Sequence, residues 1–222
     1  MAEEVRTVTG RRGPAPLPDG WQRLALGDLC SLQVGPHVRP DDRTGADGGV
    51  PLVLPRDLVH QRITQADRVG LAPAKALTLE RYRLAEGDLL LTRTGTVGRC
   101  ALVTRKQHQW LYTQLVRLRL RTPDLSLAAY LTGYLSAGVA QRWMERRSAG
   151  ATIPSISLRD LGDLPVLLPP LAERKAIGET LAALDEKVRI HQEIARTTGE
   201  YRALLADLLM TGALPLEPER GP

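Results

Sequence analysis

The 222-residue sequence contains no Asn and no Phe, only two Cys, and four Lys against 26 Arg. It has no apolar run long enough to cross a bilayer. Its start, Met1-Ala2-Glu3-Glu4, lacks the apolar segment of a secretory signal. We therefore expect a cytoplasmic protein without membrane contact. Cys30 and Cys100 lie too far apart in the sequence to form a metal-ligand pair, so we expect reduced and partly buried thiols.

The charge balance favours a polyanionic partner, since the formal net charge is +5 and the pI is about 9.5. An Arg-rich chain poor in Lys and Asn is typical of a GC-rich bacterial genome, so the arginine bias alone is weak evidence for nucleic-acid binding. Arginine still provides planar, paired donors that suit phosphate and guanine. Without Asn, a two-bond contact to adenine must come from Gln. The candidates, each otherwise an ordinary surface residue, are Gln33, Gln61, Gln65, Gln107, Gln109 and Gln114.

The pattern of the chain predicts an α+β fold, in which a compact domain is followed by one long helix. Residues 1–16 are rich in Gly and Pro and predict a disordered tail. Residues 17–168 form the predicted domain, residues 169–212 the predicted helix, and residues 213–222 a second tail.

Within the domain, the composition predicts a loop over residues 33–50 and a short strand over residues 51–54. Residues 110–120 alternate apolar side chains with polar or cationic ones, which predicts one strand with a packed face and a cationic face. Apolar residues at helical spacing predict a helix over residues 125–144.

Residues 84–103 predict a β-hairpin. The turn Gly87-Asp88 precedes a buried strand of three leucines, and a second strand returns from Cys100. The tip between them carries arginines, hydroxyls and two glycines. Such a tip can reach phosphates and base edges, although it can equally be a structural turn closed by glycine. The tip residues proposed for DNA contact are Arg93, Thr94, Thr96 and Arg99.

Residues 171–210 predict one long amphipathic helix, about 60 Å in length at 1.5 Å per residue. The segment contains no Pro, and its apolar residues step by four and three, as in helices that pack on another helix. Gly199 is a possible kink and Gly212 an expected C-terminal cap. The predicted seam consists of Ile177, Leu181, Leu184, Val188, Tyr201, Leu205 and Leu208.

The order of these segments resembles one half of the specificity subunit of type I restriction–modification systems. The matching motifs are Leu17-Pro18-Asp19-Gly20-Trp21 at the entry, residues 26–29, the hairpin over residues 87–98, the junction over residues 164–177 and the helix exit over residues 208–214. Each motif alone is weak evidence, but their order and spacing agree with the family. The resemblance covers nearly all of the chain after residue 16.

The resemblance implies a non-catalytic subunit that binds double-stranded DNA. It also implies a DNA adenine methyltransferase partner that uses S-adenosylmethionine, a possible restriction-nuclease partner, and no cofactor in this chain. Subunits of the family carry two recognition domains and two helices, whereas this sequence has one of each. Three alternatives follow: pairing with a second copy, pairing with another half, or membership of a related defence system that uses one domain.

Other candidate DNA contacts lie in loops, which often carry recognition residues. For the glutamines the alternative is an ordinary surface residue, and for Arg105 and Lys106 it is the end of a hairpin beside a core Trp110. The candidates are Gln33, His37, Arg39, Arg43, Arg105, Lys106 and Gln114.

Enzyme motifs fail on specific residues. Leu168-Pro169-Pro170-Leu171 lacks the Asn or Asp and the aromatic residue of an amino-methyltransferase motif. Glu173-Arg174-Lys175 has a nuclease-like spacing, but it opens the long helix without an accompanying Pro-Asp strand. The four His residues show no metal-ligand spacing. The alternative from another class is a coiled-coil assembly or scaffold protein of a phage-defence system that does not read DNA.

Overall fold

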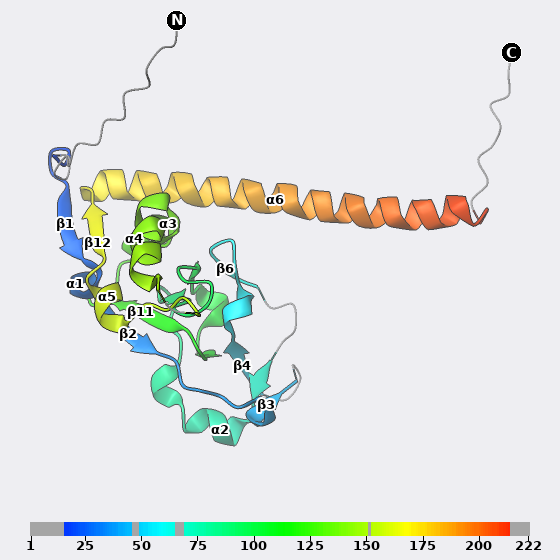
Figure 1. Ribbon diagram of the computed structural model, residues 1–222, viewed down its shortest axis with the longest axis horizontal. Helices are drawn as coiled ribbons and strands as arrows, with labels where there is room; N and C mark the ends of the chain where they lie inside the picture. The colour runs from blue at the N-terminus through cyan, green and yellow to red at the C-terminus, as the bar shows by residue number, and fades with distance from the viewer. Residues whose placement is uncertain (1–15, 46–48, 65–68, 151, 214–222) are drawn as a thin grey trace, which may run out of the picture.

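The computed structural model describes residues 16–45, 49–64, 69–150 and 152–213, and it has two parts (Figure 1). A compact α+β part lies beneath the first half of helix α6 (Leu171–Met210), and the second half of α6 extends well beyond it. This arrangement confirms the predicted fold class. The two predicted tails lie outside the described residues, apart from Pro16 and Ala213.

An antiparallel four-stranded sheet, which we call the central sheet, forms the middle of the compact part. Its outer strands are β2 and β9, and β11 and β8 lie between them. Val34, Val116, Leu91 and Cys100 stand in one row across it. The hairpin predicted over residues 84–103 is confirmed, because β8 pairs with β9. In spatial order the strands are β2 (Cys30–Val34), β11 (Val116–Leu120), β8 (Leu89–Leu91) and β9 (Cys100–Leu102).

The central sheet is covered on both faces, which accounts for the run of three buried leucines in β8. Successive side chains of a strand point to opposite faces. Leu89 and Leu91 therefore join a core cluster with α3 (Leu125–Ser136) and α4 (Gly138–Ser148). Leu90 joins a second core cluster on the opposite face.

A second sheet lies on that opposite face, farther from α6 (Figure 1). Its strand β4 agrees with the strand predicted over residues 51–54. The loop predicted over residues 33–50 is only partly confirmed, because Arg43 and Thr44 form a strand that pairs with Leu71 and Gly70. The strands in spatial order are β10 (Leu111–Tyr112), β4 (Val50–Val53), β7 (Gly70–Leu71) and β3 (Arg43–Thr44).

The remaining short elements close the compact part. Strand β1 pairs antiparallel with β12, so the start of the described chain lies beside the residues that lead into α6. A two-stranded hairpin, β5 with β6, reaches toward α6. These elements are β1 (Gln22–Ala25), α1 (Leu26–Leu29), β5 (Leu58–Val59), β6 (Arg62–Ile63), α2 (Pro73–Leu77), α5 (Leu158–Gly162), β12 (Pro165–Leu168) and 3₁₀ turns at Pro40–Asp42, Pro55–Asp57, Glu80–Tyr82 and Arg105–Gln107.

The prediction of one strand with a cationic face over residues 110–120 is wrong. The segment forms two strands in different sheets, with Gln114 at a φ of +57° between them. Arg117 is buried, and its guanidinium donates to the carbonyl oxygens of Arg81 and Arg83. Arg119 makes a two-bond ion pair with the buried Asp88, at 2.7 Å for each bond. These two arginines hold the interior together because the second sheet covers their face of β11.

The single helix predicted over residues 125–144 is also wrong. The chain forms α3 and α4, separated by Ala137 in an extended conformation (φ −72°, ψ 150°). The Gln141 side chain donates to the carbonyl oxygen of Leu135 at 2.6 Å and so replaces a backbone partner lost at the break. No Pro marks the position in the sequence.

Helix α6 docks on α3 through its first turns. Gly178 packs against the backbone of Tyr130, and a Cβ placed on Gly133 would lie 2.7 Å from Leu181. Arg174 forms an ion pair with Asp124, the N-cap of α3. Ile177 packs against the first core cluster. The sequence assigns the predicted seam to a dimer or partner helix, but its first two residues, Ile177 and Leu181, pack at least partly on the chain's own domain.

The later turns of α6 leave their apolar side chains exposed. Leu184 is 55% exposed and Tyr201 is 63% exposed, while Leu208 is half-buried. The helix continues through Gly199 and ends at Met210, followed by Gly212 at a φ of +71° as the expected cap. Among the described residues, no helix combines the length and the apolar character needed to cross a membrane.

Candidate nucleic-acid interface

One end of the central sheet gathers several of the predicted contact residues. Beyond the row from Val34 to Cys100, β8 leads into the hairpin tip, β2 leads into the segment that carries His37, and Gln114 precedes β11. Because neighbouring strands are antiparallel, these three connections leave or enter the sheet at the same end of its strands. We call this the tip end of the sheet.

The hairpin tip has a defined local structure. Gly95 and Gly98 have φ values of +74° and +93°, which glycine adopts without strain. The buried Thr92 hydroxyl donates to the carbonyl oxygen of Thr96 and accepts from the backbone N–H of Arg99, the latter at 3.0 Å. Both glycines and Thr92 fix the loop from within. The exposed residues of the tip are Thr94, Thr96 and Arg99, all proposed from the sequence.

Arg93 differs from Arg99, because it is half-buried. Its guanidinium donates to the carbonyl oxygen of Ile156 at 3.3 Å, and the backbone N–H of Ile156 donates to the carbonyl oxygen of Arg93 at 3.0 Å. Arg93 is therefore less exposed than the other tip residues proposed for DNA contact. This residue ties the tip to the segment after α4, and only part of its donor capacity faces solvent.

Gln33 and Gln114 lie at the tip end but in different states. The Tyr112 hydroxyl donates to the side-chain oxygen of Gln33 at 3.1 Å, so Gln33 is half-buried and engaged within the chain. Gln114 is exposed at its left-handed turn, beside Thr113, whose hydroxyl donates to the carbonyl oxygen of Pro36 at 2.7 Å. His37 is exposed on the adjoining segment. Gln114 is the glutamine best placed to meet a base edge from this end.

Arg39 and Arg43 belong to the approach to the second sheet. Arg39 is exposed, whereas Arg43 is half-buried and donates to the carbonyl oxygen of Val38 at 3.1 Å. Arg43 therefore holds the bend before β3, and Arg39 keeps its donors in solvent.

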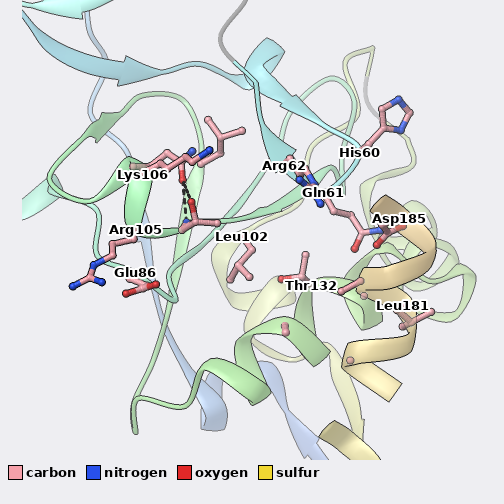
Figure 2. A pocket seen from close by; sticks show the side chains of 17 residues that line it. His60, Gln61, Arg62, Glu86, Leu102, Arg105, Lys106, Thr132, Leu181 and Asp185 are labelled. Carbon is pink, nitrogen blue, oxygen red and sulfur yellow. Dashed lines mark hydrogen bonds between the residues drawn. The ribbon is translucent and has the colours of Figure 1, made fainter. Parts of the chain in front are cut away.

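Arg105 and Lys106 are exposed at the opposite end of the central sheet, beyond the paired residues Leu89 and Leu102. The structure does not bring them together with the hairpin tip. They line a cavity of about 590 Å³ that lies between α6, α3 and the β5–β6 hairpin (Figure 2). Their neighbour Gln107 is buried and accepts from Thr104, so it is excluded as a base-reading residue.

Contacts between the β5–β6 hairpin and α6 close the far side of this cavity. Arg62 forms an ion pair with Glu186, and Figure 2 shows the Gln61 side chain pointing toward Asp185. Burial raises the pKa of Asp185 above its usual value, and nearby Arg62 opposes this change. His60 and Gln61 have φ values of +47° and +61°, a left-handed conformation that is uncommon outside glycine. The hairpin thus acts as a strut between the domain and α6.

The structure adds to the tip end three residues that sequence reasoning missed. Arg142, Arg146 and Arg147 are exposed on α4, whose Gln141 donates to the carbonyl oxygen of Gly98 in the tip at 2.9 Å. The spacing of Arg142 and Arg146 places them on one face of a helix, and this was the available sequence signal. The contact between this helix and the hairpin tip depends on tertiary packing, which no local sequence pattern predicts.

The titratable residues that could hold a metal or act as nucleophiles are dispersed or buried in the part of the chain that the structure describes. Among them, no three His, Cys, Asp or Glu side chains gather to hold a metal ion. The thiols of Cys30 and Cys100 are free and buried, and burial raises the pKa of each to about 12. Both therefore remain protonated at neutral pH and serve as small core residues.

Comparison with known proteins now identifies the class. Residues 18–197 match the model of the type I restriction modification DNA specificity domain. The chain belongs to this family.

Two Escherichia coli specificity subunits are among its relatives. It is 33% identical over 192 residues to that of the type I restriction enzyme EcoKI, covering 80% of this chain and 40% of the relative. It is 24% identical over 216 residues to that of EcoEI, covering 93% of this chain and 36% of the relative. This chain thus spans about two fifths of the relatives' length.

Solved structures share the fold. A chain from a structural study of complex assembly in the type I R-M system has a TM-score of 0.62 at 22% identity, covering 86% of this chain and 45% of that one. The type I restriction-modification S subunit from M. genitalium has a TM-score of 0.59 at 18% identity, covering 87% of this chain and 47% of that one.

Proposed function

We propose that this chain is a sequence-specific double-stranded DNA recognition half-subunit, which directs a partner adenine methyltransferase to its target. The observation that carries the proposal is the tip end of the central sheet. There, a fixed glycine-containing hairpin presents Arg99, Thr94 and Thr96 to solvent beside Gln114. Arg99 makes no ion pair with a described residue, so its donors are available to phosphate or guanine.

Assembly through α6 is part of the proposal. Most of the apolar residues beyond Leu181 are exposed, and they repeat at the spacing of a helix that packs on another helix. A second copy, or a second half-subunit, would cover them. Two recognition domains joined in this way would read two half-sites at a separation set by the helices.

Chemistry would come from the partners. We infer that the methyltransferase subunit supplies S-adenosylmethionine and the transfer step, and that a restriction nuclease can join the same complex in the cytoplasm. In this scheme the present chain holds no cofactor. The present chain would contribute DNA binding and would position the methyltransferase on its target.

The test is selection of duplexes from a random DNA library by the chain co-expressed with its methyltransferase subunit. We expect one enriched motif, which also becomes methylated in the host genome only when the gene is present. Assembly with the methyltransferase and no enriched motif would instead favour the scaffold alternative.

A further inference from the structure

We propose that helix α4 is a second DNA-binding element, in which Arg142 and Arg146 contact phosphates beside the hairpin tip. The inference rests on the proposed DNA-recognition function. It extends that function to a helix that the sequence analysis did not propose as a DNA contact.

Helix α4 packs directly on the tip. The Gln141 side chain donates to the carbonyl oxygen of Gly98 at 2.9 Å and to that of Leu135 at 2.6 Å. A Cβ placed on Gly98 would lie 2.8 Å from the Gln141 side-chain oxygen and 3.0 Å from Met144. These side-chain ends therefore lie directly against Gly98, whose φ of +93° glycine adopts without strain. Helix α4 and the tip are therefore direct neighbours.

The segment after α4 returns to the tip and fixes this arrangement. The backbone N–H of Gly95 donates to the carbonyl oxygen of Pro154 at 2.9 Å, and Thr94 forms a β-bridge with Ser155. The neighbouring Thr152 and Ser155 are exposed. Tip, helix and returning segment thus contact one another and form one structural unit.

The charge of this unit is almost entirely positive. Residues 92–99 and 138–157 contain five Arg and one acidic residue, Glu145. Arg142 and Arg146 are exposed and share one face of α4, and neither makes an ion pair with a described residue. Arg147 differs, because its guanidinium stacks over the Trp143 ring at 3.9 Å. Arg142 and Arg146 are therefore the pair left available for an anion.

Phosphate is the anion that the geometry favours. Exposed guanidinium groups bind phosphate through paired, charge-assisted bonds. In protein–DNA complexes, half to two-thirds of the hydrogen bonds go to phosphate and sugar. An acidic patch on a protein partner would offer the same charge. DNA is favoured because α4 packs directly against the tip that is proposed to bind it, and the experiment separates the two partners.

The experiment measures binding by the complex of this chain with its methyltransferase subunit. Three duplexes are used: the selected target, a one-base variant and random DNA, each over a range of salt concentrations. The test variant is Arg142→Gln with Arg146→Gln. The control is Lys175→Gln with Arg196→Gln, which removes the same charge from exposed positions on α6. Thermal unfolding establishes that both variants remain folded, and the single Arg variants serve if the double variant does not.

We expect the test variant to lose affinity for all three duplexes by the same factor. With a salt slope of about 0.9 per phosphate, the loss should be roughly ten- to sixty-fold at 0.1 M salt, and the slope should fall by about two units. Each single variant should lower the slope by about one unit. The methylated motif should stay unchanged.

Three outcomes would overturn the inference. A test variant that binds like the control, with an unchanged slope, would show that α4 does not contact phosphate while DNA recognition stands. Loss of methyltransferase co-purification with unaltered DNA affinity would assign α4 to the protein partner. A wild-type complex that does not distinguish the three duplexes would overturn the proposed function itself.

Discussion

Helix α6 and the tip end of the central sheet use arginine in opposite ways. On α6, Arg189 and Arg196 pair with glutamates one turn away, and residues 171–210 contain six Lys or Arg against seven Asp or Glu. At the tip and α4, five Arg face one acidic residue. The chain's net charge of +5 therefore arises outside the long helix. The number of arginines in a region is therefore a poor guide to where a polyanion could bind. A better guide is whether those arginines already form ion pairs within the chain.

The strongest test of this contrast replaces apolar residues of α6. Leu184→Asp with Val188→Asp should reduce self-association or half-subunit pairing at least a thousandfold, about 4 kcal/mol, because unpaired charges would be buried between helices. Leu181 is left intact because it packs on Gly133. Light scattering over a concentration series measures the effect. A wild-type chain that stays monomeric at high concentration without a partner would contradict assembly through α6.

A second test separates interior arginines from surface ones. Asp88→Ala should lower the free energy of unfolding by about 2–3 kcal/mol, because Arg119 and the backbone N–H of Ala85 lose their acceptor. Denaturant unfolding measures it, with Arg99→Ala as the matched control, since Arg99 makes no ion pair with a described residue. Equal stability of the two variants would show that the buried pair contributes little.

A third test concerns the tip itself. Arg99→Ala should reduce partner-dependent DNA binding at least tenfold, about 1.4 kcal/mol, without changing stability. Arg93→Ala should also lose about 1 kcal/mol of stability, because it removes the bond to Ile156. Binding is compared on target, one-base variant and random DNA at two salt concentrations. If both variants bind all three as wild type does, the hairpin is only a structural turn.

The smallest effect is expected on the paired charges of α6. Arg196→Ala removes an exposed ion pair with Glu200 and should change stability by at most about 0.5 kcal/mol. DNA affinity should stay within twofold of wild type, measured in the same binding assay. A larger loss of affinity would mean that α6 also contacts DNA, which would end the contrast between the two regions.

The sequence predicted the elements whose signals are local. The turn at Gly87-Asp88, three leucines and two tip glycines indicated the hairpin, and forty residues without Pro indicated α6. The alternation of apolar and cationic residues in the sequence could not predict that Arg117 and Arg119 form contacts within the chain. Alternation reveals two faces of a strand but not that a second sheet covers one of them. The break at Ala137 and the contact of Gln141 with Gly98 likewise depend on tertiary packing.

The strut formed by the β5–β6 hairpin also sets a mechanical limit. Beyond Glu186, residues 187–210 extend about 36 Å as an unsupported lever. A swing of about 10° at the strut would move the free end by about 6 Å, close to the rise of two base pairs. If two such levers set the distance between half-sites, the packing of α6 on α3 and the Arg62–Glu186 ion pair together limit how far that distance varies. A complex that contains an Arg62→Ala variant and the partner methyltransferase should then methylate sites of altered spacing more readily than the wild-type complex does.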